Sequence, residues 1–155
     1  MKAILAASFD PPTLGHEDLI KRAAKIFDKL YVGIGKNNKK KPYLPIKSRQ
    51  ALLERICKEY SNVEVVLFDG LLVEYCKEHG IGIIVRGLRA TLDFEYELSM
   101  AHVNKKLMEE VDTIFLPTEV ENSFVSSSIV REIHEHGGDI SAFVSWEVEE
   151  YLTGG

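Results

Sequence analysis

Short apolar runs alternate with amphipathic segments along the chain, and this alternation predicts its secondary structure. Runs that are apolar throughout are typical of parallel strands that are covered on both faces. Such runs predict five strands, at residues 3–7, 30–34, 63–68, 81–85 and 113–116. The fourth strand is expected to end at Arg86.

Apolar residues at helical spacing fill the segments between these strands. The spacing predicts helices after a turn at residues 10–12 and over 48–59, 71–79 and 92–109. In the last of these, an apolar stripe is formed by Tyr96, Met100, Val103 and Leu107. Two further helices are expected to begin at serines 126–128 and near Ser145, whose hydroxyl is expected to cap the second one.

The alternation of strands and helices favours an α/β fold in one domain, residues 1–155. We predict a doubly wound, Rossmann-like parallel sheet of five strands with helices on both faces. In such sheets, ligands bind beyond the carboxyl ends of the strands, near the point where the strand order reverses. The loops after the first, second, fourth and fifth strands are therefore the places to look for chemistry.

The charge of the chain narrows the class of ligand. Lys and Arg total 19 and Asp and Glu total 24, so the formal net charge is −5. This balance argues against a nucleic-acid coat or a binder of anionic membranes, because both need clustered positive charge. Residues 36–49, however, contain no acid and six basic residues: Lys36, Lys39, Lys40, Lys41, Lys47 and Arg49. One concentrated basic loop on an acidic protein suggests a small polyanion as ligand.

The cysteines and the N-terminus bear on the cellular compartment. Cys57 and Cys76 form no CxxC pair, and both fall in predicted helices, which favours reduced, buried thiols. The N-terminal apolar stretch stops at Asp10, and no window is apolar over the ~18 residues of a membrane span. A cytoplasmic protein is expected. Cys76 and His79 lack a second pair of ligands, so no metal held by the protein is expected.

The loop after the first strand contains Thr13–Leu14–Gly15–His16 at a helix start. Glycine permits close approach of a ligand to the backbone, and the free N–H groups of a helix start attract anions. His16 would then donate to a phosphate oxygen. The alternative is an ordinary turn with His16 on the surface. The chain has no GxGxxG or GxxxxGK[ST] motif to bind phosphate instead.

Three other loops carry anion-binding side chains. Lysines after the second strand are either a solvated face or mobile phosphate ligands. Arg86 and Arg89 follow the fourth strand, and they either bind phosphate or pair with Asp93, Glu95 and Glu97. The serines 126–128, with Arg131 one turn later, form a potential anion cradle, and capping would need only one of them.

The motifs SFDPPTLGH and SSSIVRE resemble those of the nucleotidyltransferase superfamily with the [HT]xGH turn. The segment RGLRATLDFEYELSMAHVNKKL closely resembles the phosphopantetheine adenylyltransferase family, and the likeness extends over nearly the whole chain. It implies a Rossmann-like nucleotidyltransferase fold. It also implies transfer of AMP from ATP to 4′-phosphopantetheine, which gives dephospho-coenzyme A (dephospho-CoA) and pyrophosphate.

The resemblance also implies roles for individual residues. Those implied in catalysis are His16, Lys40 and Arg86. Those implied in ATP binding are Ser8, Phe9, His16, Gly87, Arg89, Glu97, Ser126, Ser127 and Ser128. Those implied in binding the acceptor are Ser8, Lys40, Leu71, Leu72, Arg86, Asn104 and Glu132.

The family further implies Mg²⁺ held mainly by ATP phosphates, a homohexamer, and coenzyme A as a competing feedback inhibitor. The chain departs from the family at Ala7, where a glycine is usual, and at Asn122, where an aromatic residue is common. The first change reduces the freedom of the backbone. The second change removes the aromatic ring that would stack near the nucleotide.

The expected mechanism needs no general base. A phosphomonoester has a second pKa of about 6, so at neutral pH the acceptor is mostly a dianion already. Catalysis then consists of aligning two phosphates and stabilising charge on the transferred group. Two alternatives remain at this point: the same chemistry with another nucleotide or acceptor, and a non-catalytic nucleotide sensor.

Overall fold

The computed structural model describes residues 1–37 and 40–154. Lys39 of the basic loop lies outside the described residues. Within them, the five strands are β1 (Lys2–Ala7), β2 (Lys29–Gly35), β3 (Val63–Phe68), β4 (Ile83–Leu88) and β5 (Asp112–Pro117). The helices are α1 (Leu14–Ile26), α2 (Ile46–Ile56), α3 (Leu72–His79), α4 (Thr91–Leu107), α5 (Ser127–Glu135) and α6 (Trp146–Thr153). Short 3₁₀ turns span Cys57–Glu59 and Val120–Asn122.

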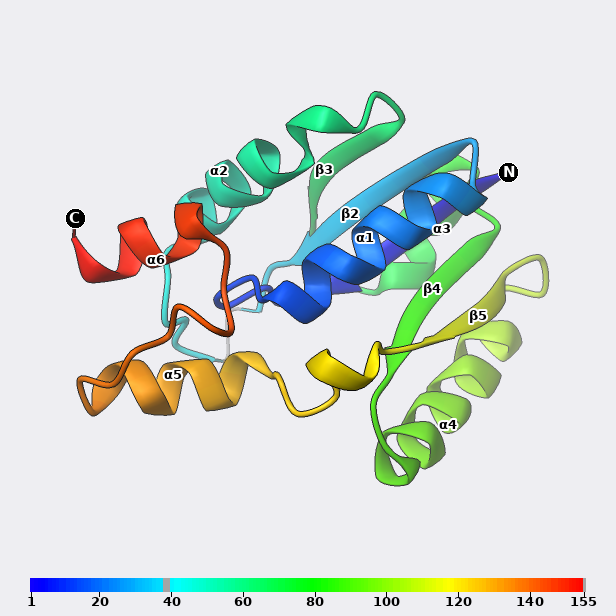
Figure 1. The fold of residues 1–155 in the computed structure, drawn as a ribbon. Helices are drawn as coiled ribbons and strands as arrows, with labels where there is room; N and C mark the ends of the chain where they lie inside the picture. The colour runs from blue at the N-terminus through cyan, green and yellow to red at the C-terminus, as the bar shows by residue number, and fades with distance from the viewer. Residues whose placement is uncertain (38–39, 155) are drawn as a thin grey trace.

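The strands form one parallel sheet in the order β3-β2-β1-β4-β5 (Figure 1). Successive residues of β1 face opposite layers: Ala3 and Leu5 pack with α1 and α2, whereas Ile4 and Ala6 pack with α3. α4 covers β4 and β5. The predicted doubly wound sheet with helices on both faces is confirmed.

The fourth strand differs from its predicted bounds. It begins at Ile83 instead of residue 81 and continues through Arg86 to Leu88. Its pairing with β1 ends at Leu5–Val85, whereas its pairing with β5 continues to Leu88–Pro117. The ladder with β5 therefore extends the strand past its apolar run. β1 and β4 part beyond Val85, which opens the sheet at the point where the strand order reverses.

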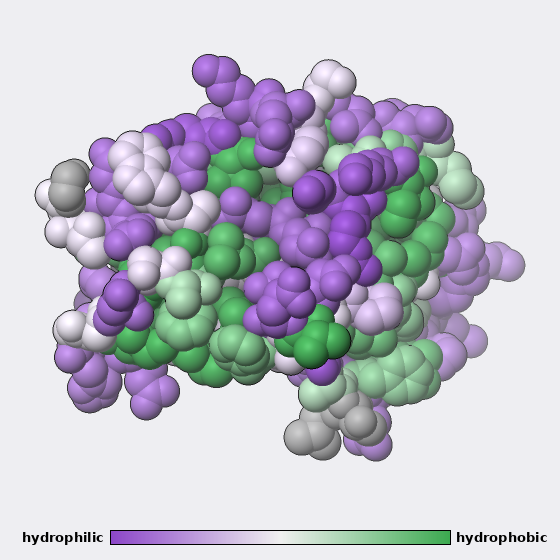
Figure 2. Space-filling model, viewed as in Figure 1, coloured by the Kyte–Doolittle hydropathy of each residue, from purple (hydrophilic) through white to green (hydrophobic). Residues whose placement is uncertain are grey.

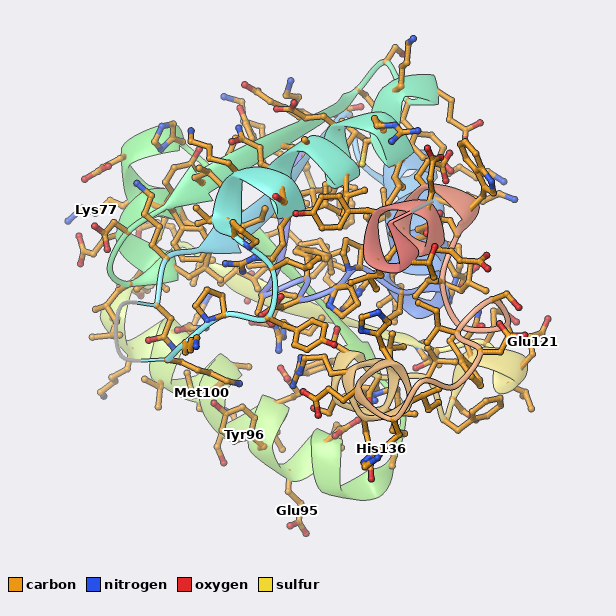
Figure 3. The ribbon with its side chains drawn as sticks, turned by 90° about the vertical axis from the view of Figure 1, so that its left-hand side faces the viewer. Lys77, Glu95, Tyr96, Met100, Glu121 and His136 are labelled. Carbon is orange, nitrogen blue, oxygen red and sulfur yellow. The ribbon has the colours of Figure 1, made fainter. Side chains whose placement is uncertain are left out.

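The stripe on α4 also differs from expectation. A helical stripe of this kind normally faces the core, but Tyr96, Met100, Val103 and Leu107 are 64%, 37%, 48% and 55% exposed. Figure 3 shows Tyr96 and Met100 on the surface of the helix. More generally, apolar side chains reach the surface on both sides of a polar band in Figure 2. The stripe is therefore not explained by packing within one chain.

The C-terminal helices pack outside the sheet. Val130 of α5 and Val148 of α6 join a separate apolar cluster with Leu44 and Leu52. Ser145 stands at the N-cap of α6, but its hydroxyl makes no capping hydrogen bond, so that part of the prediction is wrong. Among the described residues, no helix combines the length and the apolar character needed to cross a membrane.

Candidate active site

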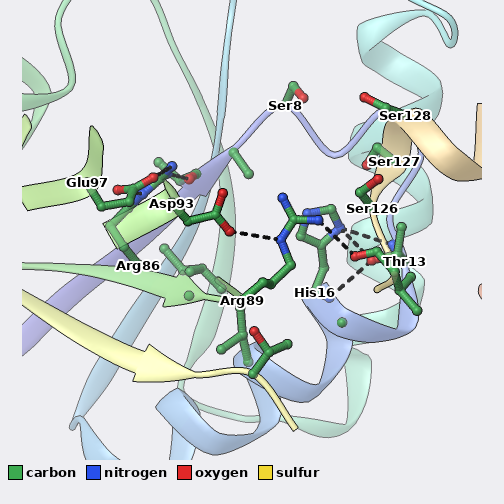
Figure 4. A pocket seen from close by; sticks show the side chains of 18 of the residues that line it. Ser8, Thr13, His16, Arg86, Arg89, Asp93, Glu97, Ser126, Ser127 and Ser128 are labelled. Carbon is green, nitrogen blue, oxygen red and sulfur yellow. Dashed lines mark hydrogen bonds and ion pairs between the residues drawn. The ribbon is translucent and has the colours of Figure 1, made fainter. Parts of the chain in front are cut away.

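The gap between β1 and β4 contains a pocket of about 310 Å³ (Figure 4). The loops after the first, second, fourth and fifth strands all contribute to its wall, as the strand-end rule predicts. Ten predicted site residues line it: Ser8, His16, Lys40, Arg86, Gly87, Arg89, Glu97, Ser126, Ser127 and Ser128.

Five predicted site residues do not line this pocket. Phe9 is fully buried, and its ring packs edge-on against the His16 ring with 4.7 Å between centroids. Leu71 and Leu72 lie at the start of α3, and Asn104 lies on α4. Glu132 is exposed on α5. The pocket therefore brings together the residues predicted to bind phosphate. The other predicted acceptor contacts, Leu71, Leu72, Asn104 and Glu132, lie outside it.

Other lining residues were not predicted as site residues. Thr13 is the N-cap of α1, and Asp93 was predicted only to pair with an arginine. Arg131 belongs to the predicted serine cradle, in which it has no separate role. Thr118 carried no signal in the sequence; its backbone N–H and its hydroxyl both donate to the Leu88 carbonyl, which places it at the pocket wall.

The start of α1 fixes the orientation of His16. The Thr13 hydroxyl accepts from the His16 backbone N–H, and the Thr13 backbone N–H donates to His16 Nδ1 at 3.0 Å. This is a capping box in which the imidazole takes the place of the usual Glu or Gln. Because a backbone N–H can only donate, Nδ1 must accept, and the neutral ring carries its proton on Nε2. His16 is thus an oriented donor at the pocket wall.

Burial lowers the pKa of His16 from 6.5 to about 4, and the nearby positive charges of Arg89 and Arg86 add to this effect. The ring is therefore neutral at physiological pH. It can donate one hydrogen bond to a phosphate oxygen but adds no positive charge of its own.

We expect NMR to show that the His16 ring does not titrate between pH 8 and about pH 5. The native state binds this proton less readily than the unfolded chain, so this group's contribution to stability falls as the pH drops from 6.5 toward 4. Ring resonances, assigned by their loss in His16→Gln, provide the measurement. A midpoint near the ordinary value of a histidine would contradict the buried, neutral assignment.

Arg86, near the end of β4, and Arg89, just after it, are both paired within the site. Arg86 binds Glu97 in a bidentate arrangement, with Nε–Oε2 and Nη2–Oε1 distances of 2.8 and 2.7 Å. It also donates to the Ala6 carbonyl of β1. Arg89 pairs with Asp93 at 3.4 Å and donates to the Val125 carbonyl. Of the three acids predicted as partners, Asp93 and Glu97 are the ones that pair with these arginines, and both arginines line the pocket as well.

The serine run divides its tasks. Ser126 caps α5 by accepting from the Ile129 N–H, as capping requires. The Ser127 hydroxyl donates to the Pro11 carbonyl at 2.8 Å, and the Ser128 hydroxyl accepts from Arg131. Arg131 also donates to the Asp10 carbonyl. Ser127 therefore joins the start of α5 to the loop after β1 directly, and Ser128 bonds the arginine that also joins it.

The basic loop is less uniform than its sequence suggests. Lys40 lines the pocket, whereas Lys36 and Lys41 are exposed and absent from its lining. Arg49 is only 6% exposed, and it donates to the carbonyls of Leu44 and Ser8. Arg49 therefore binds the backbone and does not line the pocket.

The departure from the family motif at Ala7 disturbs little in the backbone. Ala7 is the last residue of β1, where no left-handed conformation is needed. The positive φ angle of 49° falls instead on Phe9, two residues later. Ala7 therefore needs none of the freedom of a glycine.

Carboxylates are scarce in the pocket. Among the described lining residues they are Asp93 and Glu97, and each is paired with an arginine. No group of three His, Cys, Asp or Glu side chains within the described residues is placed to hold a metal ion. The site offers neutral and positive donors, which suit phosphate oxygens better than a bare cation.

Comparisons with known proteins agree with this chemistry. Residues 4–133 match the family model described as cytidylyltransferase-like. A curated phosphopantetheine adenylyltransferase from Lachnoclostridium phytofermentans (strain ATCC 700394 / DSM 18823 / ISDg) is 53% identical over 141 residues. That alignment covers 91% of this chain and 86% of the relative.

Solved structures share the fold at low sequence identity. A protein assigned as a nicotinate-nucleotide adenylyltransferase from Vibrio parahaemolyticus superposes with a TM-score of 0.73 at 22% identity, over 99% of this chain and 91% of that one. The Plasmodium falciparum nicotinic acid mononucleotide adenylyltransferase gives a TM-score of 0.72 at 14% identity, over 99% and 94%. At these identities the likeness supports the fold alone.

Proposed function

The chain belongs to the cytidylyltransferase-like family and to the phosphopantetheine adenylyltransferases, and we propose how its pocket performs their reaction. The enzyme is a nucleotidyltransferase that moves AMP from ATP to 4′-phosphopantetheine, giving dephospho-CoA and pyrophosphate. One observation carries the residue assignments: anion-binding groups from four loops converge on a single pocket at the reversal point of the sheet.

The acceptor phosphate is proposed to bind between Ser8 and Lys40, beside Arg86. The long pantetheine arm would then leave the phosphate pocket toward the predicted contacts Leu71, Leu72, Asn104 and Glu132. These residues lie outside the pocket, which suits a substrate much longer than its phosphate group.

The ATP side is proposed to lie between α1 and α5. His16 Nε2–H would donate to the α-phosphate, and the start of α5, with Ser127 and Ser128, would bind the other phosphates. Arg89 and Gly87 complete this wall, and Phe9 supports the His16 ring from behind. Glu97 would act on ATP through Arg86, since both of its carboxylate oxygens are bound there.

The chemical step follows from these donors. The acceptor dianion attacks the α-phosphorus, the bond to the bridging oxygen breaks, and pyrophosphate leaves with the electron pair. Negative charge that develops on the α-phosphoryl oxygens is met by fixed N–H donors in a partly buried site. No residue needs to remove a proton, in agreement with His16, whose lowered pKa makes it a weak base and whose Nε2 already carries a proton.

Nucleotidyl transfer generally requires a divalent metal ion, and we propose Mg²⁺ here. The ion neutralises phosphate charge when it is bound. Because Asp93 and Glu97 are engaged by arginines, Mg²⁺ would be held mainly by ATP phosphate oxygens and water, which it retains readily.

Pyrophosphate release with ATP, a divalent cation and 4′-phosphopantetheine tests the reaction. We expect release that depends on the acceptor and falls sharply when CTP replaces ATP. Equal rates with CTP would point to a different nucleotide specificity. Binding of ATP without any release would point to a nucleotide sensor.

Lys40→Ala should weaken binding of 4′-phosphopantetheine at least about tenfold and change ATP binding little, because Lys40 is assigned to the acceptor phosphate. Titration calorimetry with each ligand separately measures this difference. Lys41→Ala is the matched control, since Lys41 is exposed and does not line the pocket. Equal losses for both ligands in Lys40→Ala would contradict the assignment.

A homohexamer is proposed as in the family that the motifs resemble, and the exposed apolar stripe on α4 supports an assembly between copies. Light scattering after gel filtration measures its mass.

Feedback by coenzyme A is proposed to act by competition in the acceptor region. A cytoplasmic location is proposed as well, and it is supported by two cysteines that are both free and buried.

A further inference from the structure

Asp10 holds the basic loop without lining the pocket. Its carboxylate is only 8% exposed and accepts from two successive backbone N–H groups, those of Tyr43 at 2.8 Å and Leu44 at 2.7 Å. Hydrogen bonds to an ionised acceptor are stronger than neutral ones. Asp10 therefore fixes the end of the segment that begins with Lys40.

Arg49 holds the same segment from the other side. Its guanidinium donates to the Leu44 carbonyl through Nε at 3.1 Å and to the Ser8 carbonyl through Nη1 at 2.8 Å. The N–H and the C=O of Leu44 are thus both bound by buried charged groups. The second bond of Arg49 joins that segment directly to Ser8.

The turn that carries Asp10 is itself anchored to α5. Arg131 donates to the Asp10 carbonyl at 2.6 Å, and the Ser127 hydroxyl donates to the Pro11 carbonyl at 2.8 Å. Tyr43 is also held through its side chain, because its hydroxyl lies 2.5 Å from His134 Nδ1 on the same helix. The basic loop therefore takes its place from a turn that α5 already fixes.

These contacts limit where Lys40 can reach. Lys40 lies three residues before Tyr43, so its Cα is at most about 11 Å from that of Tyr43. Burying two charged groups is expensive, and apolar residues would pack such a region at least as stably. Here both charged groups form hydrogen bonds with the backbone of one loop that contributes to the pocket, which indicates that they position this loop.

We propose that Asp10 and Arg49 are positioning residues that set the distance between Lys40 and Ser8. They thereby hold these two residues where both can bind the acceptor phosphate. The proposal rests on the function assigned above. Neither residue touches a substrate; each acts through the backbone of the loop. Misplacement by about 1 Å can cost a rate factor of about 10².

Asp10→Asn tests the carboxylate, because an amide offers one acceptor where two are needed, while the backbone contact with Arg131 remains. We expect kcat/KM for 4′-phosphopantetheine to fall by between about 10-fold and 10²-fold and ATP binding to stay within about twofold. Arg49→Lys, which keeps the charge but loses the fork, should give the same pattern. Asp139→Asn is the matched control, since Asp139 also accepts a backbone N–H but belongs to an exposed turn elsewhere.

Two further measurements separate positioning from general damage. In the background of Lys40→Ala, Asp10→Asn should cause little further loss of acceptor binding, because it acts through Lys40. Limited trypsin digestion should cut after Lys36 or Lys40 several-fold faster in Asp10→Asn than in the wild type or in Asp139→Asn. This readout needs no turnover, so it stands even if the assigned reaction fails.

The outcomes are distinct. Unchanged cleavage in Asp10→Asn, or equal losses for acceptor and ATP, would overturn the positioning role. A full additional loss in the double variant would do so as well, since Asp10 would then act independently of Lys40. If the wild type showed no turnover but the loop of Asp10→Asn were cleaved faster, the assigned reaction would be rejected. The finding that Asp10 holds the loop in place would still stand.

Discussion

His16→Ala should lower kcat by ~10²–10³, the loss seen when one preorganised donor is removed from a transition state. The imidazole is oriented through Nδ1 by the Thr13 N–H and is neutral because burial and two arginines lower its pKa. Its Nε2–H is therefore a fixed donor toward the pocket. Single-turnover measurement of dephospho-CoA formation would report the chemical step directly.

The variant also removes one partner of the capping box at the start of α1. We expect stability to fall by only about 1 kcal/mol, because the Thr13 hydroxyl still caps the helix. His16→Gln is the matched control: glutamine is a usual residue at this capping position and should restore stability without restoring the rate. Near-wild-type turnover of His16→Ala would reject the role assigned to His16.

Much of the fold followed from short-range patterns. The strand at residues 63–68 was predicted with its observed bounds, because an apolar run between turns is a local signal. The fourth strand was misplaced because its last residues, Arg86 to Leu88, are held by pairing with β5, a long-range contact. The stripe on α4 was found, but its exposure was not predicted, since periodicity does not say what covers a helix.

The site was predictable where several motifs pointed to the same edge of the sheet. His16, Lys40, Arg86 and the serines carry recognisable signals, and the topology brings them together. Asp10 and Arg49 stand in the quoted motif and in the basic segment, but their contacts were not predicted, because these include backbone groups more than thirty residues away. Thr118 was missed for the same reason: only the packing of β5 against β4 places it at the wall.

The pair of Arg86 and Glu97 shows why both readings of the arginines were needed. Glu97 is 9% exposed, and both of its carboxylate oxygens are bound by Arg86. A carboxylate held in this way keeps the guanidinium turned toward the pocket. Arg86 Nη1 also donates to the Ala6 carbonyl, so the N–H groups left for phosphate are those that bind neither Glu97 nor Ala6. Pairing is therefore the means by which Arg86 is presented to a ligand.

Arg86→Ala should reduce kcat/KM by about 10³ or more, as expected for an arginine that stabilises a phosphoryl transition state. It should also lower the free energy of unfolding by about 3 kcal/mol, since it leaves the Glu97 carboxylate buried without its partner. Steady-state kinetics and urea denaturation measure the two effects separately.

A second substitution separates the loss of activity from the loss of stability, because the first comes from the missing guanidinium and the second from the unpaired Glu97 carboxylate. Adding Glu97→Gln to Arg86→Ala removes the unpaired charge, so most of the stability should return while kcat/KM stays low. If activity returned with stability, Arg86 would act only by supporting the fold. If Arg86→Ala alone were as stable as the wild type, the buried charge of Glu97 would not need Arg86 as its partner. The pair with Glu97 would then not explain why Arg86 faces the pocket.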